Sequence, residues 1–134
     1  MDIVDKHERS KLMGRIRGKD TKPELAVRRI AHRLGYRFRL HRKDLPGSPD
    51  LVFPRRCKVV FVHGCYWHRH QGCRLAYQPK SNVEFWNRKF AVNVARDRRV
   101  LVDLTDQGWK TLVIWECEVK DSDLVASRLS AHLG

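Results

Sequence analysis

Residues 58–73 have the sequence KVVFVHGCYWHRHQGC, and the interpretation of the whole chain starts from them. Their first part, Lys58–His63, is rich in β-branched and aromatic side chains, the composition of a buried strand. The ten residues that follow contain two cysteines and two histidines. Thiolate and imidazole are the side-chain groups that bind zinc best. The stretch therefore predicts a buried strand that leads directly into a metal-binding loop.

Further helices and strands are predicted on both sides of this strand. A helix begins at the Thr21 cap and ends at Gly35, with Leu25, Ile30 and Leu34 on its apolar side. A second capping box at 81–84 begins a long helix that ends near residue 107. The other elements are strands over 36–40, 50–53 and 109–116 and a closing helix over 122–133. This order predicts one α/β domain in which helices cover a mixed sheet.

The charge of the chain favours a polyanionic partner. Its 134 residues carry 28 Lys+Arg against 15 Asp+Glu, a formal net charge of +13. Because this charge is spread along the chain, a folded basic surface that binds nucleic acid phosphates is expected. The alternative is a protein that is merely basic, since charge alone specifies no ligand.

The sequence also bears on location. It has no run of about 18 apolar residues, so we expect no membrane span. Its first residues lack the apolar core of a signal peptide, which favours the cytoplasm. There the four cysteines stay reduced, and metal binding is a better explanation for them than disulfides.

Three of the predicted zinc ligands, Cys65, His70 and Cys73, lie within nine residues. A closed structural site is tetrahedral and needs a fourth ligand. We expect Cys117 to be that ligand, because it would tie the loop to a second strand. Cys57, at the start of the preceding strand, is the competing candidate. In the alternative interpretation, these residues are buried thiols and surface histidines that bind no metal.

A second site is predicted where Asp50 opens one strand and its antiparallel neighbour ends at Val62 and His63. Mg²⁺ prefers oxygen ligands, so the Asp50 carboxylate, the Val62 carbonyl oxygen and a DNA phosphate would suit it. His68 is not needed by the zinc, and it is therefore available to take a proton from the attacking water. The alternative for Asp50 is an ordinary turn-capping role after Pro49.

Two further carboxylates are candidates. Glu24 completes the capping box of the first helix, and in addition it could point toward a metal. The long helix has an apolar stripe made of Val83, Trp86, Phe90, Val94, Leu101 and Leu104. Asp97 falls on this stripe and needs a partner there. That partner is either His63 or His68, which would make a His–Asp pair, or a nearby arginine.

Aromatic side chains suggest how DNA is engaged. Tyr66 and Trp67 lie among the predicted zinc ligands, and Trp86 lies near the start of the long helix. Such rings can wedge between base pairs, and Met13 is predicted to do so from the other groove. Core packing is the alternative for Trp86 and the preferred interpretation for Trp115. Phosphate contacts are predicted for Arg15, Arg17, Lys19, Lys22 and Arg96.

Five motifs are distinctive in combination: Pro49-Asp50, Val62–His68, Glu84-Phe85-Trp86, Arg96–Arg99 and Trp115-Glu116-Cys117. Together they resemble the very short patch repair (Vsr) DNA mismatch endonucleases, over nearly the whole chain. The resemblance implies a restriction-endonuclease-like fold that nicks one DNA strand 5′ to the T of a T:G mismatch. Such mismatches arise when 5-methylcytosine deaminates. It also implies catalytic Mg²⁺ and structural Zn²⁺.

The resemblance assigns roles to individual residues as well. It implies Asp50 and the Val62 backbone oxygen as Mg²⁺ ligands, His68 as general base, His63 as a phosphate or water contact and Glu24 as an acidic contributor. It places Cys65, His70, Cys73 and Cys117 at the zinc positions and Tyr66, Trp67 and Trp86 in an intercalating wedge. The chain differs from the best-known relatives at Val62, where they have threonine.

Three hypotheses follow for the function. The first is a T:G mismatch endonuclease acting on double-stranded DNA, expected to be a monomer with one domain over 1–134 and a basic DNA-contacting arm over 1–20. We expect it in the bacterial cytoplasm, associated with the nucleoid. The second is a related nuclease with another mismatch or site specificity. The third is a zinc-supported DNA-binding module in which Asp50 and His68 are structural.

Overall fold

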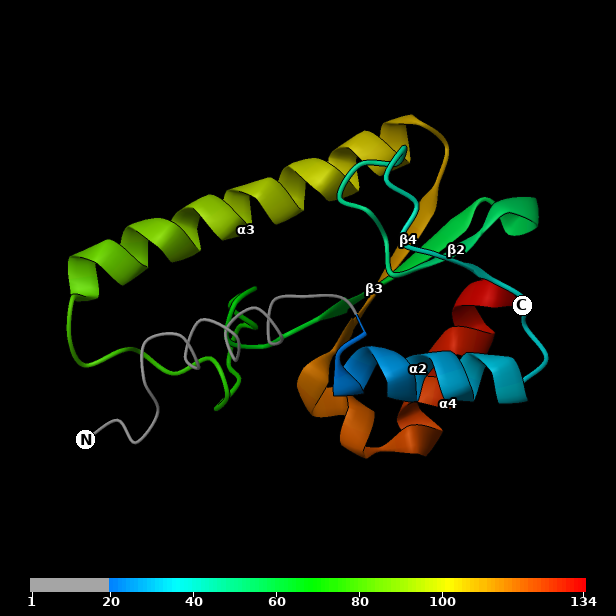
Figure 1. The fold of residues 1–134 in the computed structure, drawn as a ribbon, viewed down its shortest axis with the longest axis horizontal. Coiled ribbons are helices and arrows are strands. Elements are labelled where there is room, and N and C mark those ends of the chain that lie inside the picture. Colours follow the sequence, from blue (N-terminus) through cyan, green and yellow to red (C-terminus); the bar gives the residue numbers. More distant parts are fainter. Residues whose placement is uncertain (1–19) are drawn as a thin grey trace.

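Four strands form one mixed sheet in the computed structural model, which describes residues 20–134 (Figure 1). They are β1 (Arg39–Leu40), β2 (Leu51–Phe53), β3 (Lys58–His63) and β4 (Lys110–Trp115), in the spatial order β1-β2-β3-β4. Strand β2 is antiparallel to β1 and β3, whereas β3 and β4 are parallel. A parallel pair needs a long crossover, which helix α3 (Val83–Asp106) supplies. The α/β class with a mixed sheet is therefore confirmed.

Helices cover both faces of the sheet. On one face α2 (Lys22–Arg33) and α4 (Ser122–Leu133) lie side by side, and α3 packs against the other (Figure 1). Side chains of β3 alternate between the two faces, with Val60 and Val62 toward α2 and α4. Val59 and Phe61 point toward α3, and the same alternation directs His63 to that side. Coverage of both faces explains why the four central residues of β3, from Val59 to Val62, are all apolar.

The buried side of α2 differs from the prediction. Leu25 and Leu34 were expected on it, but they are 40% and 41% exposed. Ile30 is buried as predicted, and Val27, Ala31 and Glu24 are buried with it. The small side chains of Val27 and Ala31 let α2 lie close to α4 and the sheet.

Helix α3 departs from the prediction at its beginning. The capping box at 81–84 is wrong: Asn82 precedes the helix with a φ of +52°, and within the described chain its side chain makes no capping bond. A box requires an extended cap residue, which a left-handed one cannot provide. Of the predicted apolar stripe only Phe90 and Leu104 are buried, and Val83 is 42% exposed. The first half of α3 extends beyond the sheet, so nothing in the sheet covers it (Figure 1).

Strand β1 is shorter than predicted. Only Arg39–Leu40 pairs with β2, which is itself a short strand of three residues. Tyr36 and Phe38 precede the strand and pack edge-on against Phe53, so they contribute to the core from outside the sheet.

Length alone would let α3 cross a bilayer, since 24 residues of helix extend about 36 Å. None of the helices within residues 20–134 combines sufficient length with sufficient apolarity for a membrane span.

Candidate active site and metal centre

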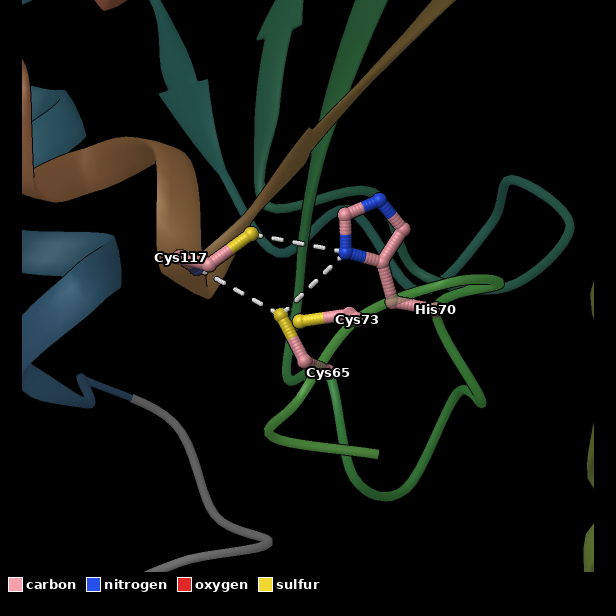
Figure 2. A group of neighbouring side chains, drawn as sticks. All are labelled: Cys65, His70, Cys73 and Cys117. Atoms are coloured by element: carbon pink, nitrogen blue, oxygen red, sulfur yellow. Dashed lines mark hydrogen bonds between the residues drawn. The ribbon is translucent and has the colours of Figure 1, made fainter. Parts of the chain in front are cut away.

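Four soft-ligand side chains converge beyond the ends of β3 and β4, namely Cys65, His70, Cys73 and Cys117 (Figure 2). We call them the Cys/His cluster. The first three belong to the loop after β3, and Cys117 lies in the short helix η2 (Glu116–Lys120) after β4. Parallel pairing brings these two strand ends together. One ligand atom from each residue lies within 4.8 Å of the others, as a tetrahedral metal site requires.

The contacts inside the Cys/His cluster are close. His70 Nδ1 lies 3.6 Å from Cys65 Sγ and 3.4 Å from Cys117 Sγ. Burial raises the pKa of the Cys65 thiol to about 12, so this thiol ionises at neutral pH only beside a bound cation. The competing candidate Cys57 is exposed, and its sulfur contacts Pro54 O at 3.8 Å. The geometry favours Cys117 over Cys57.

A second group, His63, His68 and Asp97, lies between β3 and α3, and we call it the histidine group. His68 Nδ1 lies 2.7 Å from Asp97 Oδ2. The two imidazoles are stacked, with centroids 3.8 Å apart and planes inclined by 6°. The partner of Asp97 is therefore His68, one of the three possibilities that the sequence left open.

The histidine group can accept a proton. When the Nδ1–H of His68 is donated to Asp97, the lone pair on Nε2 of that ring can accept a proton. Burial, and then the neighbouring His68, lower the pKa of His63 to about 3. His63 is therefore neutral at physiological pH and acts as a hydrogen-bonding group rather than as a cation.

Carboxylates gather next to the same end of β3. The backbone N–H of Val62 donates to Asp50 Oδ2 at 2.6 Å. Burial raises the pKa of Asp50 to about 7, and the nearby Glu24 adds to the rise although the Val62 N–H opposes it. Two buried acids in this position suit a hard divalent cation, which would stabilise both. The role predicted for the Val62 carbonyl oxygen stays a prediction.

Glu24 helps to begin α2, although its carboxylate accepts from Asp20 and not, as a capping box requires, from the Thr21 cap. Its own N–H binds Thr21 Oγ1 at 3.4 Å, and its Oε2 accepts the N–H of Asp20 at 2.9 Å, so it helps to cap α2. The side chain is nevertheless 8% exposed and lies beside the Asp50 carboxylate. These hydrogen bonds hold the Glu24 carboxylate beside Asp50, and its role toward a metal stays a prediction.

Arg28 and His41 belong to this group and were missed in the sequence. Arg28 Nη2 lies 3.2 Å from Glu24 Oε2 and 2.9 Å from His41 Nε2. His41 Nδ1 in turn lies 3.9 Å from Asp50 Oδ1. We call Glu24, Arg28, His41 and Asp50 the acid group. Glu24 and Arg28 come from α2, and His41 and Asp50 come from two later segments. No local spacing in the sequence therefore marks the four residues as one group.

Two consecutive residues of β3, Val62 and His63, join the acid group to the histidine group. Val62 binds Asp50 through its backbone, and His63 stacks on His68. The Trp115 ring, predicted to be a core residue, stacks on His70 at 4.2 Å and meets the His63 ring edge-on at 5.3 Å. The Cys/His cluster therefore contacts the histidine group through the Trp115 ring.

The aromatic residues predicted to contact DNA lie together. Tyr66 contacts Trp67 and Tyr77, with centroids 4.9 and 4.8 Å away, and Trp67 lies 6.1 Å from Trp86. Tyr77 and Phe85, which the sequence analysis did not select, are 63% and 53% exposed. Tyr66, Trp67 and Trp86 are all partly buried, and Tyr77 and Phe85 are the exposed rings of this group.

Part of the predicted DNA surface cannot be placed. Met13, Arg15, Arg17 and Lys19, with the rest of the arm up to residue 19, lie outside the described residues. Lys22 and Arg96 are exposed on α2 and α3.

Comparison with known proteins identifies the family. The family model described as DNA mismatch endonuclease Vsr matches residues 1–74, more than half of the chain. The chain belongs to the Vsr family. It is 50% identical over 128 residues to the type II nicking enzyme V.XorIIP of Xanthomonas oryzae pv. oryzae, covering 96% of this chain and 93% of the relative. It is 40% identical over 119 residues to the DNA mismatch endonuclease Vsr of Escherichia coli (strain K12), covering 89% and 76%.

Another Vsr-like relative is the type II nicking enzyme V.NmeAIP of Neisseria meningitidis serogroup A, 40% identical over 129 residues, which cover 96% of this chain and 91% of the relative. As a Vsr family member, the protein is a DNA mismatch endonuclease, a hydrolase that acts on phosphodiester bonds. Its substrate is DNA, in agreement with the net charge of +13.

Proposed function

We propose that the protein nicks one strand of double-stranded DNA 5′ to the T of a T:G mismatch, using Mg²⁺. The observation that carries this proposal is the His68–Asp97 pair beside stacked His63, one residue after the Val62 N–H that binds Asp50. A proton acceptor and a buried carboxylate at one strand end are the parts that metal-assisted phosphodiester hydrolysis needs.

In this proposal His68 is the general base. Asp97 holds its Nδ1–H, so Nε2 is directed away from that carboxylate and takes the proton of the attacking water. His63, which stays neutral, hydrogen-bonds the phosphate or the water without competing for the proton. Asp97 also stabilises the imidazolium that forms on His68.

The acid group would hold the magnesium. Asp50 and the Val62 backbone oxygen are the proposed ligands, with Glu24 as a further carboxylate. When bound, Mg²⁺ supplies positive charge that stabilises the leaving oxygen. The buried Asp50, whose pKa lies near 7, fits such an ion because the cation removes the cost of its ionisation. Asp50 also has to stay aligned with His68, and its bond to Val62 fixes one of its oxygens.

Zinc is the ion proposed for the Cys/His cluster. Three thiol sulfurs and one imidazole nitrogen within 4.8 Å match its preferred tetrahedral ligand set. Bound there, it fastens the loop after β3 to η2 and keeps His70 stacked on Trp115. This role is structural, because all four positions are taken by the protein.

The aromatic residues would open the duplex. Trp67 and Trp86 are proposed to wedge between base pairs at the mismatch, supported by Tyr66, with Met13 acting from the other groove. Lys22 and Arg96 would bind phosphates. We propose that one domain over 1–134, acting as a monomer, suffices for the reaction, with its basic arm over 1–20.

A second candidate concerns specificity alone. Several relatives carry the name of type II nicking enzymes, so nicking within another mismatch context is possible for this chain. Cleavage of a panel of labelled duplexes, with every mismatch in several flanking contexts and with fully paired controls, separates the candidates.

The first proposal predicts one nick in the T-containing strand of T:G duplexes when Mg²⁺ is present, and none in a control with a chelator. Nicking should appear only with Mg²⁺. Preference for another mismatch would favour the second candidate. Full activity of His68→Ala would refute the role of that residue as base.

A further inference from the structure

A cation already lies among the carboxylates at the start of α2. Asp20, Glu24 and His41 each present a ligand atom within 4.8 Å of the others, an arrangement that could hold a metal ion. The Arg28 guanidinium lies among them, with Nη2 at 2.7 Å from Asp20 Oδ1 and 3.2 Å from Glu24 Oε2. This positive charge takes the place that a second metal would need.

Arg28 also determines the orientation of the His41 ring. A guanidinium only donates hydrogen bonds, so His41 Nε2, 2.9 Å from Arg28 Nη2, must be the acceptor. The proton of the neutral ring is therefore on Nδ1. That nitrogen faces Asp50 Oδ1 at 3.9 Å, while the other Asp50 oxygen accepts the Val62 N–H at 2.6 Å.

The backbone of His41 is arranged for this contact. Its φ is +47°, a left-handed conformation that costs a non-glycine residue roughly 1 kcal/mol or more. The side chain is 13% exposed, and its ring lies between the carboxylates of Glu24 and Asp50. A strained and enclosed histidine whose nitrogens lie 3.5 Å from Glu24 Oε2 and 3.9 Å from Asp50 Oδ1 is more than a surface residue.

We propose that Arg28 and His41 form a clamp that positions the two carboxylates of the acid group around one divalent ion. Arg28 holds Glu24 and fixes the ring of His41, and the Nδ1–H of His41 then attracts the Asp50 carboxylate electrostatically across 3.9 Å. His41 is a positioning residue in this scheme and not a metal ligand, because Arg28 engages one ring nitrogen and a proton occupies the other. The inference rests on the proposed role of Asp50 as a metal ligand.

Two substitutions of His41 separate positioning from mere packing. His41→Gly removes the ring without backbone strain, whereas His41→Asn tolerates the left-handed conformation and places an N–H₂ group where Nδ1 was. His41→Gly should raise the Mg²⁺ concentration for half-maximal nicking about tenfold, as loss of a residue that orients a ligand does. It should also lower kcat and leave KM for the T:G duplex unchanged. His41→Asn should restore most of the Mg²⁺ affinity and most of kcat.

The control is His32→Asn, which changes an exposed histidine on α2 and should behave like the wild type. A His41→Asn variant no better than His41→Gly would overturn the clamp, as would an unchanged Mg²⁺ dependence in both. Melting temperature and zinc content of each variant establish that the fold is retained.

A binding measurement keeps this test independent of the nicking reaction. Mn²⁺ is titrated into each protein bound to a nicked T:G duplex, and the EPR signal of the free ion is followed. His41→Gly should bind Mn²⁺ about tenfold more weakly than wild type and His41→Asn. Equal affinities would contradict the clamp, even if the wild type preferred another substrate. Absence of T:G nicking in the wild type would contradict the proposed function alone.

Arg28→Met tests the guanidinium itself. If Arg28 occupies a cation position, its removal frees Asp20, Glu24 and His41 to bind one Mn²⁺ more than the wild type binds. An unchanged stoichiometry would show that Arg28 does not substitute for a cation.

Discussion

The Cys/His cluster and the acid group lie at the same end of the sheet, yet they are built in opposite ways. Three members of the Cys/His cluster come from nine consecutive residues, and only Cys117 comes from elsewhere. The acid group takes Glu24 and Arg28 from α2, His41 from the loop after β1 and Asp50 from the residue before β2. One set consists of soft sulfur and nitrogen atoms that suit an enclosed ion, and the other combines two carboxylates with a guanidinium and an imidazole. The proposed structural centre is thus encoded locally, whereas the proposed reactive one is assembled by the fold.

The largest expected effect comes from Asp50→Asn, which should damage only the acid group. The amide still offers an oxygen to the Val62 N–H but carries no charge for a divalent ion. We expect the single-turnover nicking rate on a T:G duplex to fall about ten-thousand-fold. Zinc content and melting temperature should stay close to those of the wild type. A rate within tenfold of the wild type would remove Asp50 from the mechanism.

Cys65→Ala should have the converse effect. Loss of one ligand opens the Cys/His cluster, so we expect less than one zinc per chain and a free energy of unfolding lower by at least about 4 kcal/mol. Metal analysis and chemical denaturation measure the two quantities. Cys57→Ala is the matched control, because Cys57 is an exposed thiol outside the cluster. Equal zinc content in both variants would contradict the assignment of the ligands.

Stability should depend on pH through Asp50 in magnesium-free buffer. The pKa of this carboxyl is about 7 in the folded protein against an ordinary value of 3.8, so the folded state retains a proton that the unfolded chain has lost. The contribution of Asp50 to stability is therefore greatest below about pH 4 and falls as the pH rises to about 7, by at most about 4 kcal/mol. Denaturation of wild type and Asp50→Asn between these limits isolates the effect. A difference between the two proteins that does not change with pH would contradict it.

The smallest effect is expected for Asp97→Asn in the histidine group. Without the carboxylate, His68 loses the partner that fixes its tautomer and stabilises its protonated form. The single-turnover rate should fall about a hundredfold, with unchanged zinc content. Asp103→Asn, an exposed acid on the same helix, is the control and should retain full activity. If both substitutions behave alike, Asp97 has no special role.

The comparison of the two regions also explains what the sequence could predict. Strand β3 and helix α4 were predicted with the bounds that the structure has, because their apolar patterns are strong and local. The Cys/His cluster could be predicted because three of its members are close together in the sequence. Cys117 could be added because it follows β4, whose end lies beside the end of β3 in the parallel pair. Asp97 could be selected as a carboxylate on an apolar stripe, although only the structure distinguishes His68 from the other possible partners.

The remaining parts depend on tertiary geometry that no local pattern encodes. His41 acquires its importance from a left-handed backbone and from contacts with Arg28 and Asp50, residues 13 and 9 positions away. The buried side of α2 was misassigned because leucine hydrophobicity outweighs the smaller Val27 and Ala31 in the sequence pattern, while close helix packing favours the smaller residues. The entry into α3 depends on the left-handed Asn82, which the sequence 81–84 does not distinguish from an ordinary cap.

The central claim is that the acid group and the histidine group act on one divalent ion, and paramagnetic broadening tests it most directly. Mn²⁺ is added to protein with isotope-labelled histidines, bound to a nicked T:G duplex, and the imidazole signals are recorded. We predict that the signals of His41, His63 and His68 broaden first, while that of His132, which lies on α4 and contacts Val59 O, stays sharp. The broadening should disappear in Asp50→Asn. Sharp His63 and His68 signals at Mn²⁺ concentrations that support nicking would contradict a shared metal site.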